Sequence, residues 1–319
     1  MPRTPGTFYS RLVANPAVCE WKGTLYYVFR GQDERGHDQL GCWVAEAAVA
    51  DGVHWSPLTS GDRVVVPVSD NTADCDASHV LDPALVEAEG RLQLFYTAKN
   101  NAWQPNNSLA WAVFDGLDFV KRPTNPVLRG ASAPELVKHE GQFYLFFQRA
   151  SADDRRWQVY LRVASTLEGL QLAHEEVVFG PSGLVGSPDE VSVTTCRIVQ
   201  DNGYFYLTYG ACTRFLDYPE SFCLARSTNL RDWERYPGNP ILHRGEAGGW
   251  DEGALWYPTV RRFGSKLLLW YEGAGAGMGL TTAKARAASQ RSREQDYGGY
   301  LVESFSQIGL AEADDWPAW

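Results

Sequence analysis

Short runs of alternating apolar and polar residues, closed by glycine turns, recur along the chain. The clearest run is residues 81–98, in which a proline-started apolar segment is followed by a turn at Gly90 and a second alternating segment. This pattern is typical of an antiparallel β-hairpin, because successive side chains of a strand point to opposite faces of the sheet. The sequence predicts five copies of one hairpin, since related stretches begin at Asn15, Ala133, Thr194 and Tyr257.

The copies also share the position of a proline before the turn glycine. Pro83 lies seven residues before Gly90, and the first and third copies keep that distance; the fourth has Cys196 at this place, and the fifth is one residue shorter. Each hairpin is followed by another strand, a polar turn and a short fourth strand. Four strands per repeat are typical of propeller blades. We expect an all-β fold, a single five-bladed β-propeller with four antiparallel strands per blade, as one domain over residues 1–319. Residues 7–14 are expected to give a strand to the last blade and so close the ring.

Composition and charge narrow the function classes. The net charge of −10 over 319 residues argues against nucleic acid or an anionic membrane as partner, because binding phosphates needs clustered Lys and Arg. No apolar run is long enough for a membrane span, and residues 1–16 lack the hydrophobic core of a signal peptide. We therefore expect a cytoplasmic protein whose six cysteines are free thiols. His79 and His243 are single histidines without ligand spacing, so we expect neither a catalytic metal nor another cofactor.

Several motifs resemble those of a known enzyme group. Asp82-Pro83, followed by the segment LQLFYTA, is similar to the Asp-Pro pair and repeated hairpin of the five-bladed propeller glycosidases, families 32, 43, 68 and 130 of the glycoside hydrolases and their relatives. The order Asn15-Pro16, Asp82-Pro83 and Pro134-Glu135 resembles the first three blades of family 130. The segment GGWDEGALWYP resembles the last blade of family 32-like and 43-like proteins. The resemblance spans the chain and implies a small carbohydrate substrate; it indicates the fold far more strongly than the substrate.

Glycoside cleavage needs one carboxylic acid that protonates the leaving oxygen and one carboxylate that acts as base or nucleophile. In a propeller both must project from the starts of inner strands. Asp82 and Glu135 adjoin the recurring prolines there. Asp76, Asp189 and Asp251 each lie seven residues before Pro83, Cys196 or Pro258, so each either caps a loop or serves the chemistry. The catalytic candidates, with Glu190 the best general acid among them, are Asp82, Glu135, Asp189, Glu190 and Asp251.

Blade one departs from the resemblance, because Asn15 stands where families 32 and 43 place their nucleophile or base. This favours a family 130-like arrangement, in which the blade-two aspartate is the proton donor. We expect Asn15, Asp82, Glu135, Glu190 and Asp251 to line one pocket at the end where inner strands begin. The substrate-binding candidates, which include two sugar-stacking aromatic residues, are Asn15, Arg30, Asp76, Arg149, Trp256 and Tyr257.

Three functions are compatible with these residues. The first is a hydrolase acting on a small glycoside or oligosaccharide. The second is a phosphorylase, which needs converging basic residues for inorganic phosphate; Arg30 and Arg149 are the candidates. The third is a carbohydrate-binding propeller without catalysis, whose acidic residues would be scattered around the rim. The sequence does not determine the sugar, the stereochemical outcome or the oligomeric state.

Overall fold

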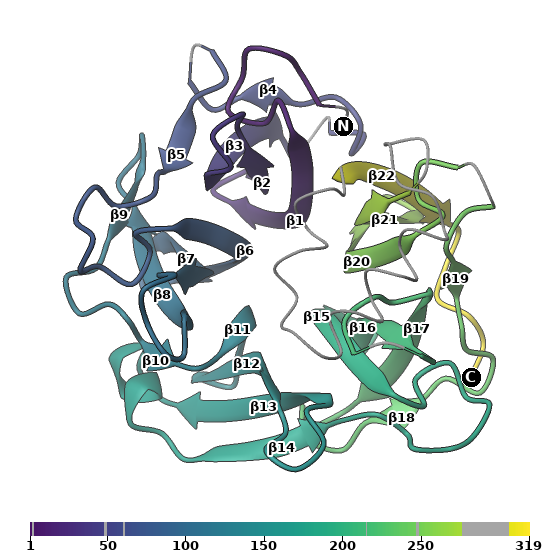
Figure 1. Cartoon of the computed structure of the whole chain (residues 1–319). Helices are drawn as coiled ribbons and strands as arrows, with labels where there is room; N and C mark the ends of the chain where they lie inside the picture. The colour runs from purple at the N-terminus through teal and green to yellow at the C-terminus, as the bar shows by residue number, and fades with distance from the viewer. Residues whose placement is uncertain (2, 48–49, 60, 215, 247–248, 276–305) are drawn as a thin grey trace.

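The computed structural model describes residues 1, 3–47, 50–59, 61–214, 216–246, 249–275 and 306–319. Strands dominate these residues. Five antiparallel meanders, one for each predicted hairpin copy, stand around a common centre (Figure 1). The predicted all-β propeller fold is confirmed.

The first two meanders have short additional strands on their outer edges. Blade one contains β1 (Leu12–Trp21), β2 (Thr24–Gln32) and β3 (Asp38–Glu46), with β4 (Ser56–Pro57) and β5 (Val64–Val66) paired to β3. Blade two contains β6 (His79–Ala88), β7 (Arg91–Lys99) and β8 (Asn107–Phe114), with β9 (Phe119–Lys121) and β10 (Leu128–Arg129) paired to β8.

The other three meanders share the three inner strands and differ in the strands that follow them. Blade three contains β11 (Ser132–His139), β12 (Gln142–Ala150), β13 (Trp157–Ala164) and β14 (Glu175–Phe179), with the 3-10 turn η1 (Glu168–Gln171) before β14. Blade four contains β15 (Ser192–Asp201), β16 (Tyr204–Cys212) and β17 (Ser221–Ser227), with β18 (Glu234–Arg235) and β19 (Leu242–His243) on β17. Blade five contains β20 (Ala254–Phe263), β21 (Lys266–Ala274) and β22 (Ser306–Ala313).

The N-terminus reaches the last blade differently from the prediction. Met1 and Ile308 exchange two backbone hydrogen bonds, of 2.5 and 3.3 Å, at β22. The expected strand over residues 7–14 does not join blade five: Leu12 to Ala14 lie in β1, where Val13 pairs with Gly31. The backbone groups of Leu12 to Ala14 are thus already paired within blade one, and Met1 makes the contact at β22.

Each inner strand carries a β-bulge at the same place. Two residues of β6, Asp82 and Pro83, lie opposite one residue of β7, Tyr96, and the other inner strands show the same two-to-one register. The first bulge residue has a φ between 48° and 56° in every case. The second bulge residue does not need to donate a backbone N–H to the neighbouring strand. Proline, which has no N–H, is therefore tolerated there. The first bulge residues are Asn15, Asp82, Ala133, Thr195 and Tyr257.

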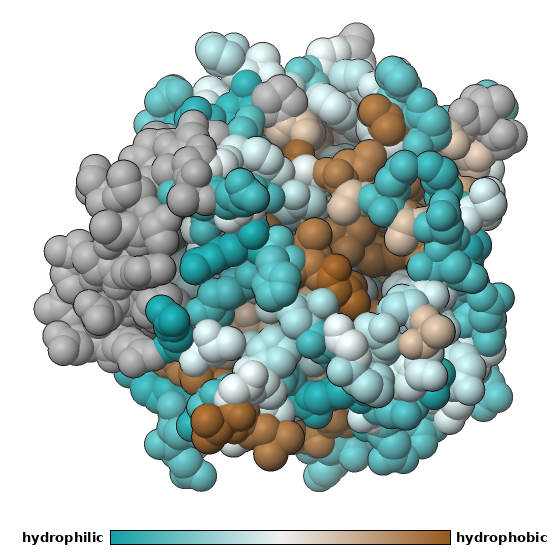
Figure 2. Space-filling model, turned by 90° about the vertical axis from the view of Figure 1, so that its right-hand side faces the viewer, coloured by the Kyte–Doolittle hydropathy of each residue, from teal (hydrophilic) through white to brown (hydrophobic). Residues whose placement is uncertain are grey.

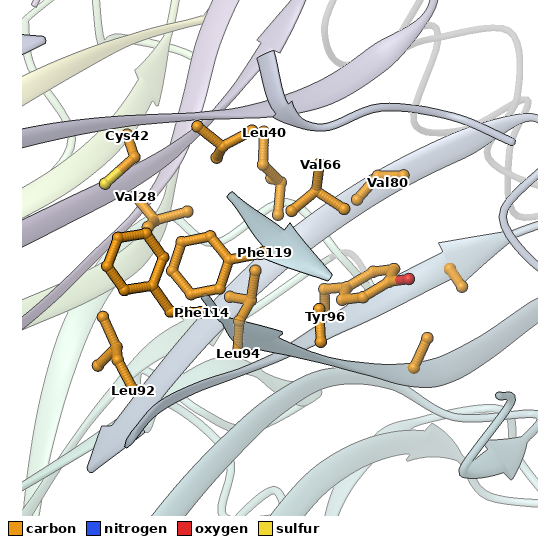
Figure 3. Packing of buried hydrophobic residues seen from close by; sticks show 14 of the residues in the cluster. Val28, Leu40, Cys42, Val66, Val80, Leu92, Leu94, Tyr96, Phe114 and Phe119 are labelled. Atoms are coloured by element: carbon orange, nitrogen blue, oxygen red, sulfur yellow. The ribbon is translucent and has the colours of Figure 1, made fainter. Parts of the chain in front are cut away.

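Apolar side chains fill the spaces between neighbouring blades. Between blades one and two, Leu92 and Leu94 of β7 face Val28 of β2 and Leu40 of β3 (Figure 3). All four are fully buried, and such burial stabilises the folded chain by about 1.5–3 kcal/mol per side chain.

The side of the molecule that carries β19, β22 and the C-terminus shows an area of apolar residues on its surface (Figure 2). No helix in the described part of the chain is long and apolar enough to cross a membrane.

Candidate active site

The five first bulge residues converge on a central cavity of about 150 Å³. A bulge redirects the side chain at its first residue, so this ring is a consequence of the backbone repeat. Three residues of the adjoining second strands also line the cavity: Arg30, Gln148 and Glu272. Each of these directly follows the aromatic residue opposite a bulge.

Asn15 connects two carboxylate-bearing residues of the cavity. Its side-chain Nδ2 donates to Oε2 of Glu272 at 2.8 Å, and its Oδ1 accepts from the backbone N–H of Asp82 at 3.4 Å. Ser306 donates a further hydrogen bond of 2.6 Å to Oε1 of Glu272. Glu272 is therefore held on both carboxylate oxygens.

Burial raises the pKa values of Glu272 and Asp217 in this cavity. Burial raises the pKa of Glu272 to about 7, which the Asp82 charge reinforces and the Arg30 charge and hydrogen bonds oppose. Burial also raises the pKa of Asp217 to about 8, with the charges of Asp82 and Glu272 adding to the effect. At neutral pH Asp217 therefore keeps its proton for most of the time and Glu272 is near the midpoint of its titration; a buried carboxyl group that keeps a proton is what a general acid requires.

Aromatic side chains form much of the remaining wall. Trp256 and Tyr257 lie at the bulge of β20, and Trp157 and Tyr218 also belong to the lining. The ring of Tyr218 packs edge-on against that of Trp256, with centroids 5.7 Å apart. Trp256 is hydrogen-bonded to Asp217, and Tyr257 is hydrogen-bonded to Asp82. These two contacts fix the carboxyl groups relative to flat apolar surfaces of the kind that bind sugar rings.

The structure brings together five of the predicted site residues: Asn15, Arg30, Asp82, Trp256 and Tyr257. Arg30 is paired behind the cavity with Asp38, at 2.7 Å from Nε to Oδ1. Asp38 in turn contacts His79 at 2.7 Å.

The remaining predicted residues lie elsewhere. Glu135 lines a second cavity, described below. Glu190 accepts a hydrogen bond from the backbone N–H of Gly186 in the loop before β15. Arg149 is hydrogen-bonded to the carbonyl of Gly130 and paired with Glu175 in blade three.

The shared spacing of Asp76, Asp189 and Asp251 corresponds to a repeated hydrogen bond. Each carboxylate accepts from the hydroxyl of the tyrosine twenty residues later, opposite the bulge: Asp76 from Tyr96 at 2.9 Å, Asp189 from Tyr209 at 3.1 Å and Asp251 from Tyr271 at 2.9 Å. None of the three aspartates lines the central cavity. The bond ties the loop before a blade to the second strand of that blade, which accounts for the constant offset.

Two carboxyl groups of the cavity, Glu272 and Asp217, were not among the sequence candidates. Glu272 had a signal: it is a charged residue inside the apolar segment LLLWYEGA, at the position that Arg30 and Gln148 hold in their own copies. Asp217 lies in the connection between β16 and β17, outside the hairpin that repeats along the sequence. Only the folded chain brings it to the axis.

The donor atoms of this cavity do not form a metal centre. Within the residues that the structure describes, no group of three or more His, Cys, Asp or Glu side chains could hold a metal ion. The six cysteines are all unpaired thiols.

Comparison with known proteins shows which solved structures share this fold. No protein-family model matches the sequence, and no curated protein matches it significantly. Among solved structures, a thermostable family-43 glycoside hydrolase is similar with a TM-score of 0.62 and 17% identity, over 85% of this chain and 87% of that chain. The GH43_1 enzyme from Xanthomonas citri, complexed with xylose, gives a TM-score of 0.64 and 14% identity, over 95% and 88%. The chain has the fold of the propeller glycosidases.

A third similar structure shows that this fold hosts more than one chemistry. An N-acetylgalactosamine deacetylase from F. plautii, in complex with blood group B trisaccharide, gives a TM-score of 0.67 and 15% identity, over 98% of this chain and 93% of that chain. At these identities the likeness concerns the fold alone. The reaction has to be argued from the residues of the central cavity.

Proposed function

We propose that the protein is a glycoside hydrolase that cleaves a small glycoside or oligosaccharide in the central cavity. The observation that carries this proposal is the convergence of Asp82, Asp217 and Glu272, from three different blades, on one aromatic-walled cavity. Acidic residues scattered around the rim would have favoured a binding propeller.

The two roles of glycoside cleavage can be divided among these groups. Asp217, whose pKa is raised to about 8, is the proton donor to the leaving oxygen. Asp82 is the carboxylate that acts as base or nucleophile. Glu272, fixed by Asn15 and Ser306, is the third group and bonds a substrate hydroxyl. Asp82 thus takes the opposite role to the one that the resemblance to family 130 suggests.

Unpartnered polar atoms in the wall support a hydroxyl-rich ligand. The hydroxyl Oγ1 of Thr195 and the indole Nε1 of Trp157 are buried without a hydrogen-bond partner among the described residues. Both residues line the cavity. Buried polar groups in folded proteins are normally hydrogen-bonded, so a sugar hydroxyl is a fitting partner for each.

Phosphorolysis is less well supported than hydrolysis. A phosphorylase needs basic groups beside the acid. Arg30 is the one arginine in the lining of the described cavity, and Asp38 neutralises it at 2.7 Å. Arg149 is engaged by Glu175 and lies outside the lining.

A screen of aryl glycosides, with and without inorganic phosphate, tests the proposal. We expect release of free sugar at a rate that phosphate does not change. Sugar 1-phosphate as the product would identify a phosphorylase. No turnover on any glycoside, with sugars still bound, would identify a binding protein.

A further inference from the structure

The second bulge residue of each inner strand lies between the candidate active site and a second cavity. The backbone carbonyl of each of these five residues accepts a hydrogen bond from a side chain. The central cavity is lined by the residue before each of them, and a second cavity, of about 130 Å³, is lined by residues that begin one position after each of them. These five residues therefore separate the two cavities, and their carbonyl groups are called the carbonyl ring below. Its members are Pro16, Pro83, Pro134, Cys196 and Pro258.

Side chains of the protein donate hydrogen bonds to all five carbonyl groups of this ring. Thr259 donates to the carbonyl of Pro16 at 2.6 Å, and Thr208 donates to that of Pro258 at 2.6 Å. The other three carbonyls share one partner, Arg197. Carbonyl oxygens that surround one group form an environment that attracts a cation, because each presents the negative end of its dipole.

The Arg197 guanidinium occupies that environment. Nη2 donates to the carbonyl of Pro83 at 2.9 Å, and Nη1 donates to that of Pro134 at 3.1 Å and, at 3.5 Å, to that of Cys196. The residue is 4% exposed. Its charge is balanced by Glu135, whose Oε2 lies 3.3 Å from Nη1 and whose Oε1 accepts from the backbone N–H of Ile198 at 3.2 Å.

Arg197 also contacts both sides of the Asp82 position. Pro83, whose carbonyl it binds, is the residue after Asp82. The guanidinium carbon lies 4.8 Å from the ring centroid of Tyr257, a cation-π contact, and the hydroxyl of Tyr257 is hydrogen-bonded to Asp82. One cation therefore fixes the backbone that carries Asp82 and the side chain that orients it.

We propose that Arg197 is a built-in axial cation and a positioning residue that holds Asp82 and Tyr257 in their active arrangement, with Glu135 as its counter-charge. The positioning role rests on the proposed function; the cation site does not. The site would accept free guanidinium when the side chain is removed.

The test is Arg197→Ala in the full chain, with guanidinium chloride at millimolar concentrations as the probe. We expect kcat to fall by about a hundredfold, since a small misplacement of a reacting group has an effect of that size. Guanidinium should restore a large part of kcat in a saturable way. Calorimetry should show guanidinium binding to Arg197→Ala and none to the wild type. The double variant Arg197→Ala/Glu135→Gln should bind it more weakly.

Two further variants separate positioning from plain stability. Leu161→Ala removes a fully buried core side chain away from the axis; it should lower Tm without changing kcat of the folded protein and without responding to guanidinium. Arg197→Lys keeps the charge but not the forked geometry, and should retain more kcat than Arg197→Met. If Arg197→Ala does not fold, the comparison of kcat between Arg197→Lys and Arg197→Met tests the positioning role instead.

The outcomes are distinguishable. Wild-type kcat in folded Arg197→Ala, or rescue of Tm without rescue of kcat, would overturn the positioning role. Absence of guanidinium binding would overturn the cation site. If the wild type cleaves no glycoside, the proposed function fails, while calorimetry and a crystal structure of Arg197→Ala still decide the inference: Asp82 and Tyr257 should be displaced in the variant and return with guanidinium bound.

Discussion

The side-chain amide of Asn15 donates a hydrogen bond of 2.8 Å to the carboxylate of Glu272, a residue 257 positions later in the chain. The contact joins the first blade to the last at the floor of the central cavity. An amide is suited to this place because it can donate to Glu272 and accept from the Asp82 backbone at once. An aspartate could not donate to Glu272, and two carboxylates at this distance would have to share a proton.

Glu272 should make stability fall as pH rises. Its pKa of about 7 in the folded protein lies above its ordinary value of 4.5. Between these values the folded chain keeps a proton that the unfolded chain has released, so the stabilisation is complete below about pH 4.5 and is lost as pH rises through 7. The difference corresponds to about 3 kcal/mol. Denaturant unfolding from pH 5 to pH 8 should show the decline, and Glu272→Gln should reduce its slope. An equal slope in both proteins would contradict this assignment.

Asp82→Asn should abolish turnover while leaving the fold nearly intact. The backbone conformation at this position suits asparagine, as the equivalent Asn15 shows with a φ of 50° against 52° at Asp82. An amide can act neither as base nor as nucleophile, and general acid or base assistance is worth about 10²- to 10⁴-fold. We expect kcat to fall at least about a hundredfold with Tm little changed. A wild-type rate would remove Asp82 from the mechanism.

Asp217 should determine the alkaline limb of the pH–rate profile. A proton donor acts only while protonated, and burial raises the pKa of Asp217 to about 8. We therefore expect kcat/KM to decline as pH rises through about 8. In Asp217→Asn the residual activity should lose this limb. If the limb persists unchanged in that variant, another group supplies the proton.

The Asp251–Tyr271 pair should contribute to stability and not to catalysis. Its hydrogen bond of 2.9 Å lies outside the lining of the central cavity. Tyr271→Phe and Asp251→Ala should each lower the free energy of unfolding, by about 1–3 kcal/mol. In the double variant the losses should be less than additive, because both remove the same bond. The kcat of the folded protein should stay near the wild-type value; a hundredfold loss in either variant would place the pair in the chemistry.

The hairpin repeat was readable from the sequence because its causes are local. Strand alternation, the turn at Gly90 and the proline at position 83 act over a few residues, and each recurs at a constant offset. The predicted hairpin copies, which begin at residues 15, 81, 133, 194 and 257, begin within three residues of the observed inner strands, at 12, 79, 132, 192 and 254. Asp82 could be singled out for the same reason, since the Asp-Pro pair marks the bulge itself.

The membership of the cavity was decided by tertiary structure. A constant offset identifies equivalent positions in the blades, but it does not say which of them face the axis: Asp76, Asp189 and Asp251 share an offset and bond to tyrosines away from the cavity. Glu272 reaches the axis because the bulge opposite Tyr271 sets the register of β20 and β21. Asp217 and Arg197 take their roles from their folded surroundings. Burial raises the pKa of Asp217, with the charges of Asp82 and Glu272 on other blades adding to the effect, and the carbonyls of Pro83 and Pro134 bind Arg197. Local sequence specifies where a strand bends; which charges then meet depends on the closure of the ring.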